Sequence, residues 1–126
     1  MIPDHITLLV QSFDASMPYY DALLPMIGFT KLRPHVWANE GGFHIQFRQA
    51  REDTRPYERY GAGMNHIGFA APSFEAVHAI REGMDRLGFP VPEIQDLDGV
   101  RALFMKDPDG IRFEVSYYPP GHSPVD

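Results

Sequence analysis

Four polar side chains in this sequence have the types and the positions to hold a divalent metal ion: His5, Gln46, His66 and Glu114. Two imidazole nitrogens, a carboxylate and an amide oxygen form a mixed ligand set that suits such an ion. A carboxylate in that set can also move a proton at a carbon next to a carbonyl group. Taken one at a time, each residue also fits a structural role, as a hydrogen-bonded strand histidine or a polar residue on a strand surface.

An internal repeat connects the four residues. Three stretches recur in the second half of the chain: 5–6 (HI) as 66–67, 12–15 (SFDA) as 73–76 (SFEA), and 28–29 (GF) as 88–89. Each histidine opens a first strand, and aligning the turns that end in Gly42 and Gly110 matches Gln46 with Glu114 in the last strands. If the two copies are related by an approximate twofold axis, the four side chains can converge on it. This joint placement favours a metal site.

The apolar pattern predicts the elements that must position these residues. Alternation places Ile6 on one face of the first strand and His5 on the other, and it separates Phe113 from Glu114 in the same way. Serines that can cap a helix follow the first strand of each copy, and Pro25 should end or kink the first helix. Further strands are expected at 29–33, 36–38 and 43–48, then at 93–95, 101–106 and 111–117. Each copy therefore reads as β-α-β-β-β.

The expected organisation is a single α+β domain with two such modules. Module 1 covers about residues 4–49 and module 2 about residues 65–118. A charged connector that contains Pro56 spans 50–64, and the tail at 119–126 has the composition of a disordered end.

Composition narrows the classes of function. The chain has 126 residues, 11 basic and 17 acidic residues, a net charge of −6 and no cysteine. We therefore expect no nucleic-acid partner, because a basic patch is missing. Thiol chemistry and disulfides are excluded. The N-terminal segment lacks the pattern of a signal peptide, and no apolar run is long enough to span a membrane, so a cytoplasmic location is expected.

Three motifs carry a resemblance to a known family: DHITLLV at 4–10, NHIGFAA at 65–71 and DPDGIRFEV at 107–115. Over about residues 4–118 the chain resembles the vicinal oxygen chelate superfamily, which includes glyoxalase I, extradiol dioxygenases and bleomycin-binding proteins. The resemblance implies two βαβββ modules that form a curved mixed sheet around a shared cavity. It also implies His5, Gln46, His66 and Glu114 as metal ligands, a divalent ion such as Zn, Ni, Co, Mn or Fe, a small-molecule substrate and a homodimer.

The superfamily contains several activities, so the resemblance leaves alternatives. The first is a metal-dependent lyase or isomerase of the lactoylglutathione-lyase (glyoxalase) type, which chelates a small oxygen-rich substrate through two oxygens and uses Glu114 as the catalytic base. The second is an extradiol-type Fe(II) dioxygenase with His5, His66 and Glu114 as a facial triad. The third is a metal-free ligand-binding protein of the bleomycin-resistance type. Gln46 stands where glyoxalase I usually has a carboxylate, which we expect to raise the Lewis acidity of the ion.

Other polar residues share the strand faces of the expected ligands. Arg48 and Arg112 are candidates to bind a substrate carboxylate, with surface ion pairs as the alternative. His44 is either a partly exposed strand residue, a donor to a ligand or an alternative ligand. Whether the site forms within one chain or between two chains is open.

Overall fold

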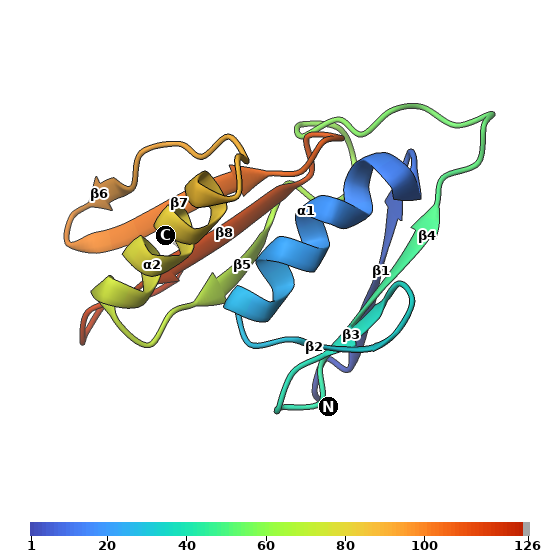
Figure 1. Cartoon of the computed structure of the whole chain (residues 1–126). Helices are drawn as coiled ribbons and strands as arrows, with labels where there is room; N and C mark the ends of the chain where they lie inside the picture. The colour runs from blue at the N-terminus through green and yellow to red at the C-terminus, as the bar shows by residue number, and fades with distance from the viewer. Residues whose placement is uncertain (125–126) are drawn as a thin grey trace. The chain divides into compact units, whose positions relative to one another are not determined.

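The computed structural model describes residues 1–124, so Val125 and Asp126 of the tail lie outside the described residues. The chain divides into two compact units, Met1–Tyr57 and Glu58–Asp126. Unit 1 contains β1 (His5–Val10), α1 (Phe13–Met26), β2 (Thr30–Arg33), β3 (Val36–Ala38) and β4 (His44–Gln49) (Figure 1). Unit 2 contains β5 (Ile67–Ala70), α2 (Phe74–Arg86), β6 (Gln95–Leu97), β7 (Val100–Lys106) and β8 (Arg112–Tyr117). The predicted β-α-β-β-β order is confirmed in both units.

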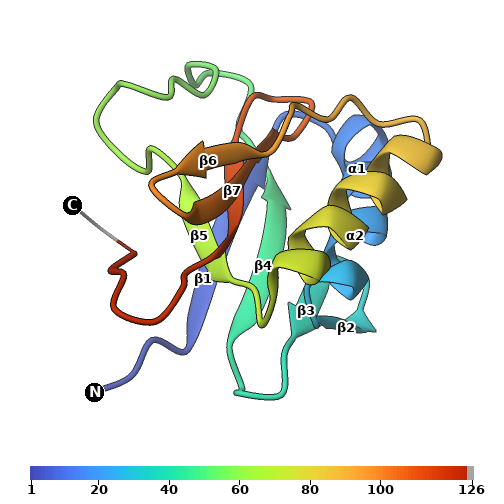
Figure 2. The ribbon, with the colours of Figure 1, turned by 90° about the vertical axis from the view of Figure 1, so that its left-hand side faces the viewer.

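Each unit has its own four-stranded mixed sheet with the same topology. The strand order is β1-β4-β3-β2 in unit 1 and β5-β8-β7-β6 in unit 2. In both sheets the first and last strands of the unit are parallel neighbours, and the other pairs are antiparallel. Figure 2 shows β4 between β1 and β3. The α+β prediction is therefore confirmed, and the strands form two sheets, one in each unit.

The core of unit 1 forms between α1 and one face of its sheet. Ser12 caps the helix by accepting a hydrogen bond from the backbone N–H of Ala15 at 3.3 Å. On the buried side of α1, the Tyr20 ring lies 4.3 Å from the Phe47 ring of β4. Trp37 of β3 is 3% exposed, and Lys31 Nζ lies 5.5 Å from the centroid of its ring.

The core of unit 2 forms between α2 and the face of β7 and β8 that carries Leu103, Phe113 and Val115 (Figure 1). Ser73 caps α2 in the same way as Ser12 caps α1. The opposite face of β8 carries Glu114. Because neighbouring residues of a strand point to opposite sides, burial of Phe113 and Val115 directs Glu114 away from the helix.

Two expectations differ in detail from the structure. Pro25 lies inside α1, which ends one residue later at Met26, so the helix ends at almost the predicted place. The strand expected at 93–95 is β6 at Gln95–Leu97, where all three residues are exposed. No helix within residues 1–124 has the length and apolar character needed to cross a membrane.

Candidate functional site

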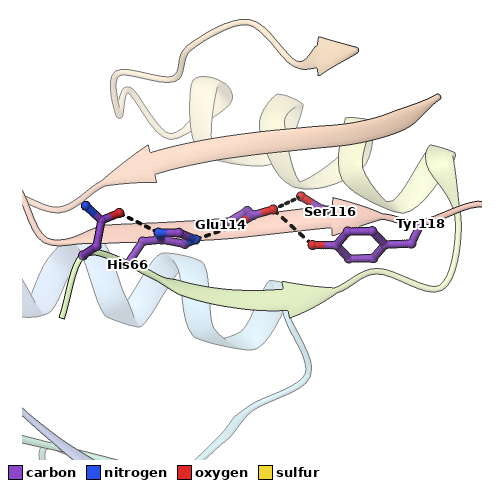
Figure 3. Close-up of polar contacts among 5 residues, drawn as sticks. His66, Glu114, Ser116 and Tyr118 are labelled. Carbon is purple, nitrogen blue, oxygen red and sulfur yellow. Dashed lines mark hydrogen bonds and ion pairs between the residues drawn. The ribbon is translucent and has the colours of Figure 1, made fainter. Parts of the chain in front are cut away.

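The candidate site in unit 2 is a direct contact between a histidine and a glutamate (Figure 3). His66 immediately precedes β5, and Glu114 lies on the neighbouring strand β8, in register with Gly68. His66 Nε2 lies 3.0 Å from Glu114 Oε2, and the two side chains are 37% and 11% exposed. The Phe104 ring, on the other neighbour of β8, packs edge-on against the imidazole. The structure thus brings together two of the four predicted ligands.

Asn65 determines which nitrogen of His66 faces the glutamate. The Asn65 amide nitrogen donates to the backbone oxygen of Arg59 at 3.0 Å, which fixes the direction of the amide group. The Asn65 oxygen therefore lies 2.7 Å from His66 Nδ1 as an acceptor, so Nδ1 carries a hydrogen. In a neutral imidazole with hydrogen on Nδ1, Nε2 has only a lone pair to offer.

This arrangement tests whether the pair suits a metal ion. The lone pair of Nε2 and a carboxylate oxygen face each other at 3.0 Å, and two acceptors at that distance repel unless a positive charge lies between them. Either a second proton on His66 or a metal ion supplies that charge. An orienting hydrogen bond on the other ring nitrogen is the usual partner of a metal-binding histidine. The chemistry of His66 and Glu114 therefore fits a divalent cation.

The second oxygen of the carboxylate is held by the protein. Glu114 Oε1 accepts hydrogen bonds from the Ser116 hydroxyl at 2.7 Å and from the Tyr118 hydroxyl at 3.1 Å (Figure 3). Ser116 is fully buried, two residues further along the same face of β8. Burial of the phenol, and next the negative charge of Glu114, raise the pKa of Tyr118 above its usual value.

In unit 1, His5 is oriented in a similar way. His5 Nδ1 donates to Asp4 Oδ2 at 2.8 Å, which leaves Nε2 as the available nitrogen. The hydrogen bond from His5 and then its charge lower the pKa of the Asp4 carboxyl group. Asp4 occupies the position of Asn65 in the repeat, so each histidine bonds to the residue that precedes it.

The surroundings of Gln46 differ from those of its repeat equivalent, Glu114. Gln46 is in register with Thr7, two residues beyond His5 along β1. In the amide orientation that gives both groups a partner, the Gln46 oxygen accepts from Arg48 Nε at 2.7 Å and from Arg48 Nη2 at 3.2 Å. A guanidinium group therefore occupies the oxygen that a metal ion would use, and Arg48, expected to bind substrate, is already engaged.

The remaining candidates also have defined places. His44 is the register partner of His5, and its Nδ1 lies 2.8 Å from the Gly42 carbonyl oxygen, as a donor, so its Nε2 is also available. Arg112 lies on the face of β8 that carries Glu114 and pairs in register with Lys106. The Nε atom of Arg112 is buried and has no hydrogen-bond partner within residues 1–124.

The predicted ligands thus fall into two pairs, one on each unit. Within residues 1–124, no three histidine, aspartate or glutamate side chains gather as a metal-binding group. Sequence reasoning missed the residues that orient the ligands: Asp4, Asn65, Ser116 and Tyr118. Two of them had a usable signal, because Asp4 and Asn65 are repeat-equivalent polar residues directly before the histidines.

Two units of βαβββ topology, each with a histidine at its first strand and with Gln46 or Glu114 on its last, have the architecture of the vicinal oxygen chelate proteins. The chain belongs to the glyoxalase/bleomycin resistance protein/dioxygenase superfamily, whose family model matches residues 2–115. This match confirms the resemblance carried by the three motifs. Members of the superfamily commonly use divalent metals, bind small molecules and often form dimers.

Individual relatives are distant. The chain is 28% identical over 123 residues to "Uncharacterized protein YqjT" of Bacillus subtilis (strain 168), across 88% of this chain and 94% of YqjT. It is 26% identical over 115 residues to "Putative ring-cleaving dioxygenase MhqA" of the same strain, across 82% of this chain but 36% of MhqA. A crystal structure of a "putative glyoxalase" from Bacillus halodurans superimposes with a TM-score of 0.79 at 22% identity, covering 93% of this chain and 96% of the other. That likeness shows the fold.

Proposed function

We propose that this protein is a metal-dependent enzyme of the glyoxalase type, a lyase or isomerase that binds a small oxygen-rich substrate through two of its oxygens. In this proposal His5, Gln46, His66 and Glu114 hold the ion. The observation that supports it most is the 3.0 Å contact between His66 Nε2 and Glu114 Oε2, a nitrogen and an oxygen that can both bind a divalent ion. Membership of a superfamily whose members commonly use divalent metals also supports the proposal.

The residues of the chain would divide the work as follows. A bound divalent ion would supply Lewis-acid polarisation of the substrate oxygens. Glu114 would remove the proton from the carbon next to the carbonyl group and return it to the neighbouring carbon. Arg112 would bind an anionic group of the substrate, because it lies on the face of β8 that carries Glu114. Arg48 would bind the same group only after giving up its hydrogen bonds to the Gln46 oxygen.

A second candidate is an extradiol-type Fe(II) dioxygenase. The hydrogen bonds from Arg48 to the Gln46 oxygen favour it, because they leave His5, His66 and Glu114 as a set of two histidines and one carboxylate. The relative MhqA, of which the match covers 36%, is named as a ring-cleaving dioxygenase and supports the same candidate. In this case Glu114 would act as a ligand and not as a base.

Metal content separates these proposals from the metal-free alternative. We would purify the untagged protein and measure bound metal by elemental analysis, for the wild type and a His66→Ala, Glu114→Ala double variant. The matched control is a His78→Ala, Glu82→Ala double variant, which removes the same residue types from the exposed surface of α2 in the same unit. We expect about one divalent ion per chain in the wild type and the control, and a loss in the first variant.

The identity of the ion then ranks the two activities. Iron, together with oxygen uptake in the presence of a catechol, would favour the dioxygenase. Nickel, zinc or cobalt, with turnover of a hemithioacetal, would favour the lyase or isomerase. If neither the wild type nor the control binds metal after reconstitution, the proposal is wrong and a ligand-binding protein takes its place. The proposal also includes a homodimer and a cytoplasmic location, to be tested by sedimentation and by cell fractionation.

A further inference from the structure

The two oxygens of the Glu114 carboxylate have different surroundings. Oε1 accepts two hydrogen bonds, from Ser116 at 2.7 Å and Tyr118 at 3.1 Å. A carboxylate oxygen has two lone pairs, so these two donors use the accepting capacity of Oε1. Oε2 accepts from neither hydroxyl group and faces His66 Nε2. Only Oε2 is therefore left for a metal ion or a proton.

The strand next to Glu114 places no side chain beside this second oxygen. Gly68 is the register partner of Glu114, and a Cβ atom at position 68 would lie 3.5 Å from Oε2. The same place in unit 1 holds Thr7, opposite Gln46. The Glu114 side chain is only 11% exposed. Glycine at position 68 adds no side chain that would cover Oε2 further.

We infer that Glu114 works through Oε2 alone, and that Ser116 and Tyr118 are positioning residues that hold Oε1 and make Glu114 a single-oxygen metal ligand. This inference rests on the proposed function. Carboxylates bind metal ions through one oxygen or through two, and the second mode occupies an extra position around the ion. Four protein ligands that each supplied one atom would leave room on a divalent ion for the two oxygens of a chelating substrate.

Cobalt binding tests the inference without any substrate. We would titrate the metal-free protein with Co²⁺ alone and record the visible absorption bands, which report the number of ligands, and the affinity by calorimetry. The variants are Tyr118→Phe, Ser116→Ala and the double variant. Tyr117→Phe is the matched control, because it removes a hydroxyl group from the adjacent position, which pairs in register with Arg101 and lies on the opposite face of β8 from Glu114.

We expect the visible bands of the double variant to change in position and intensity as Oε1 becomes available to the ion, and the affinity to fall about 10-fold to 100-fold. Tyr118→Phe alone should show part of both effects, and Tyr117→Phe should match the wild type. Tyr118→Phe keeps the aromatic ring of a half-buried residue, so it remains informative if Ser116→Ala fails to fold.

Two results would overturn the inference, and they differ in what else they overturn. A wild type that binds Co²⁺ with bands and affinity identical to the double variant removes the positioning role and leaves the proposed function in place. A wild type that binds no Co²⁺ removes both, because a carboxylate cannot be positioned for an ion that the protein does not take.

Discussion

Single hydrogen bonds decide what each candidate ligand can offer. Asn65 and Asp4 place hydrogen on Nδ1 of His66 and His5, and both histidines then present Nε2. Ser116 and Tyr118 occupy one oxygen of Glu114, and Arg48 occupies the oxygen of Gln46. The unit 2 pair is already in contact, whereas Gln46 must exchange a guanidinium partner before it can bind a metal ion.

A threonine at position 68 should hinder metal binding. The Gly68→Thr change copies the residue found at the equivalent place in unit 1, and its side chain would contact Glu114 Oε2. Gly68 lies outside the left-handed backbone region, so the backbone accepts the change. We expect Co²⁺ affinity to fall about 10-fold or more, with the reverse change Thr7→Gly as the control. Equal affinities for the wild type and Gly68→Thr would show that access to Oε2 does not matter.

Deprotonation of Tyr118 should lower the free energy of unfolding at high pH. Because the pKa of Tyr118 is raised above 10.0, the folded protein keeps the phenol proton where the unfolded chain loses it. Its contribution to stability is complete below about pH 10 and is lost as the pH rises through the folded-state pKa. Urea unfolding between about pH 9 and about pH 11 should therefore show a smaller decline for Tyr118→Phe than for the wild type.

The pKa of Tyr118 also depends on the negative charge of Glu114. Glu114→Gln removes the negative charge next to the phenol, so the Tyr118 pKa should move back toward its usual value. Ultraviolet titration of the tyrosines can follow this change. A Tyr118 pKa that is unchanged in Glu114→Gln would leave burial as the whole cause.

The strand face on which each candidate ligand lies could be predicted from the sequence, whereas its hydrogen-bond partners could not. Alternation correctly placed His5 and Glu114 away from the apolar faces of their strands. The hydrogen bond from Tyr118 to Glu114 depends on how the chain bends after β8, which no pattern records. Arg48 shares a face with Gln46, as expected, but its contact with the amide only becomes visible in the structure.

At the scale of elements, the β7–β8 hairpin determines where Glu114 lies. Its turn contains Asp107, which is 4% exposed and accepts hydrogen bonds at Oδ1 from the backbone N–H groups of Asp109 at 2.9 Å and Ile111 at 2.8 Å. Gly110 has a φ of 86°, a conformation that favours glycine. The sequence predicted this turn because its residue types match the positions they occupy.

Removing the Asp107 carboxylate should therefore destabilise the hairpin. Asp107→Ala leaves two backbone donors without their acceptor, and we expect a loss of about 2–3 kcal/mol in the free energy of unfolding. Asp107→Asn retains an acceptor oxygen and should lose less, which makes it the control. Chemical denaturation followed by circular dichroism measures both. Similar stability for the alanine variant and the wild type would show that the backbone alone holds the turn.

Strands with one buried face were the elements most accessible to prediction. The buried residues Leu8 and Val10 alternate with exposed ones in β1, which gives a clear pattern. All three residues of β6 are exposed, so that strand carries no alternation and its predicted bounds shared only Gln95 with the structure. Pairing with β7, and not its own sequence, makes this segment a strand.

At the scale of the whole molecule, each unit supplies two of the four proposed ligands. Under the proposed ligand set, His5→Ala should weaken Co²⁺ binding about as much as His66→Ala does, in the range of about 10-fold to 100-fold. Calorimetric titration of the two single variants measures this. His35→Ala, in the turn between β2 and β3 of unit 1, is the control. A His5→Ala protein with wild-type affinity would restrict the site to unit 2.

The internal repeat is broken in one spectroscopically useful place. The sequence has a single tryptophan, Trp37, and it lies in the buried core of unit 1. Its fluorescence during unfolding reports on that unit, whereas circular dichroism reports on both. Coincident transitions by the two methods would mean that the halves of the repeat unfold as one cooperative body, and separate transitions would mean that one half keeps its structure after the other has lost it.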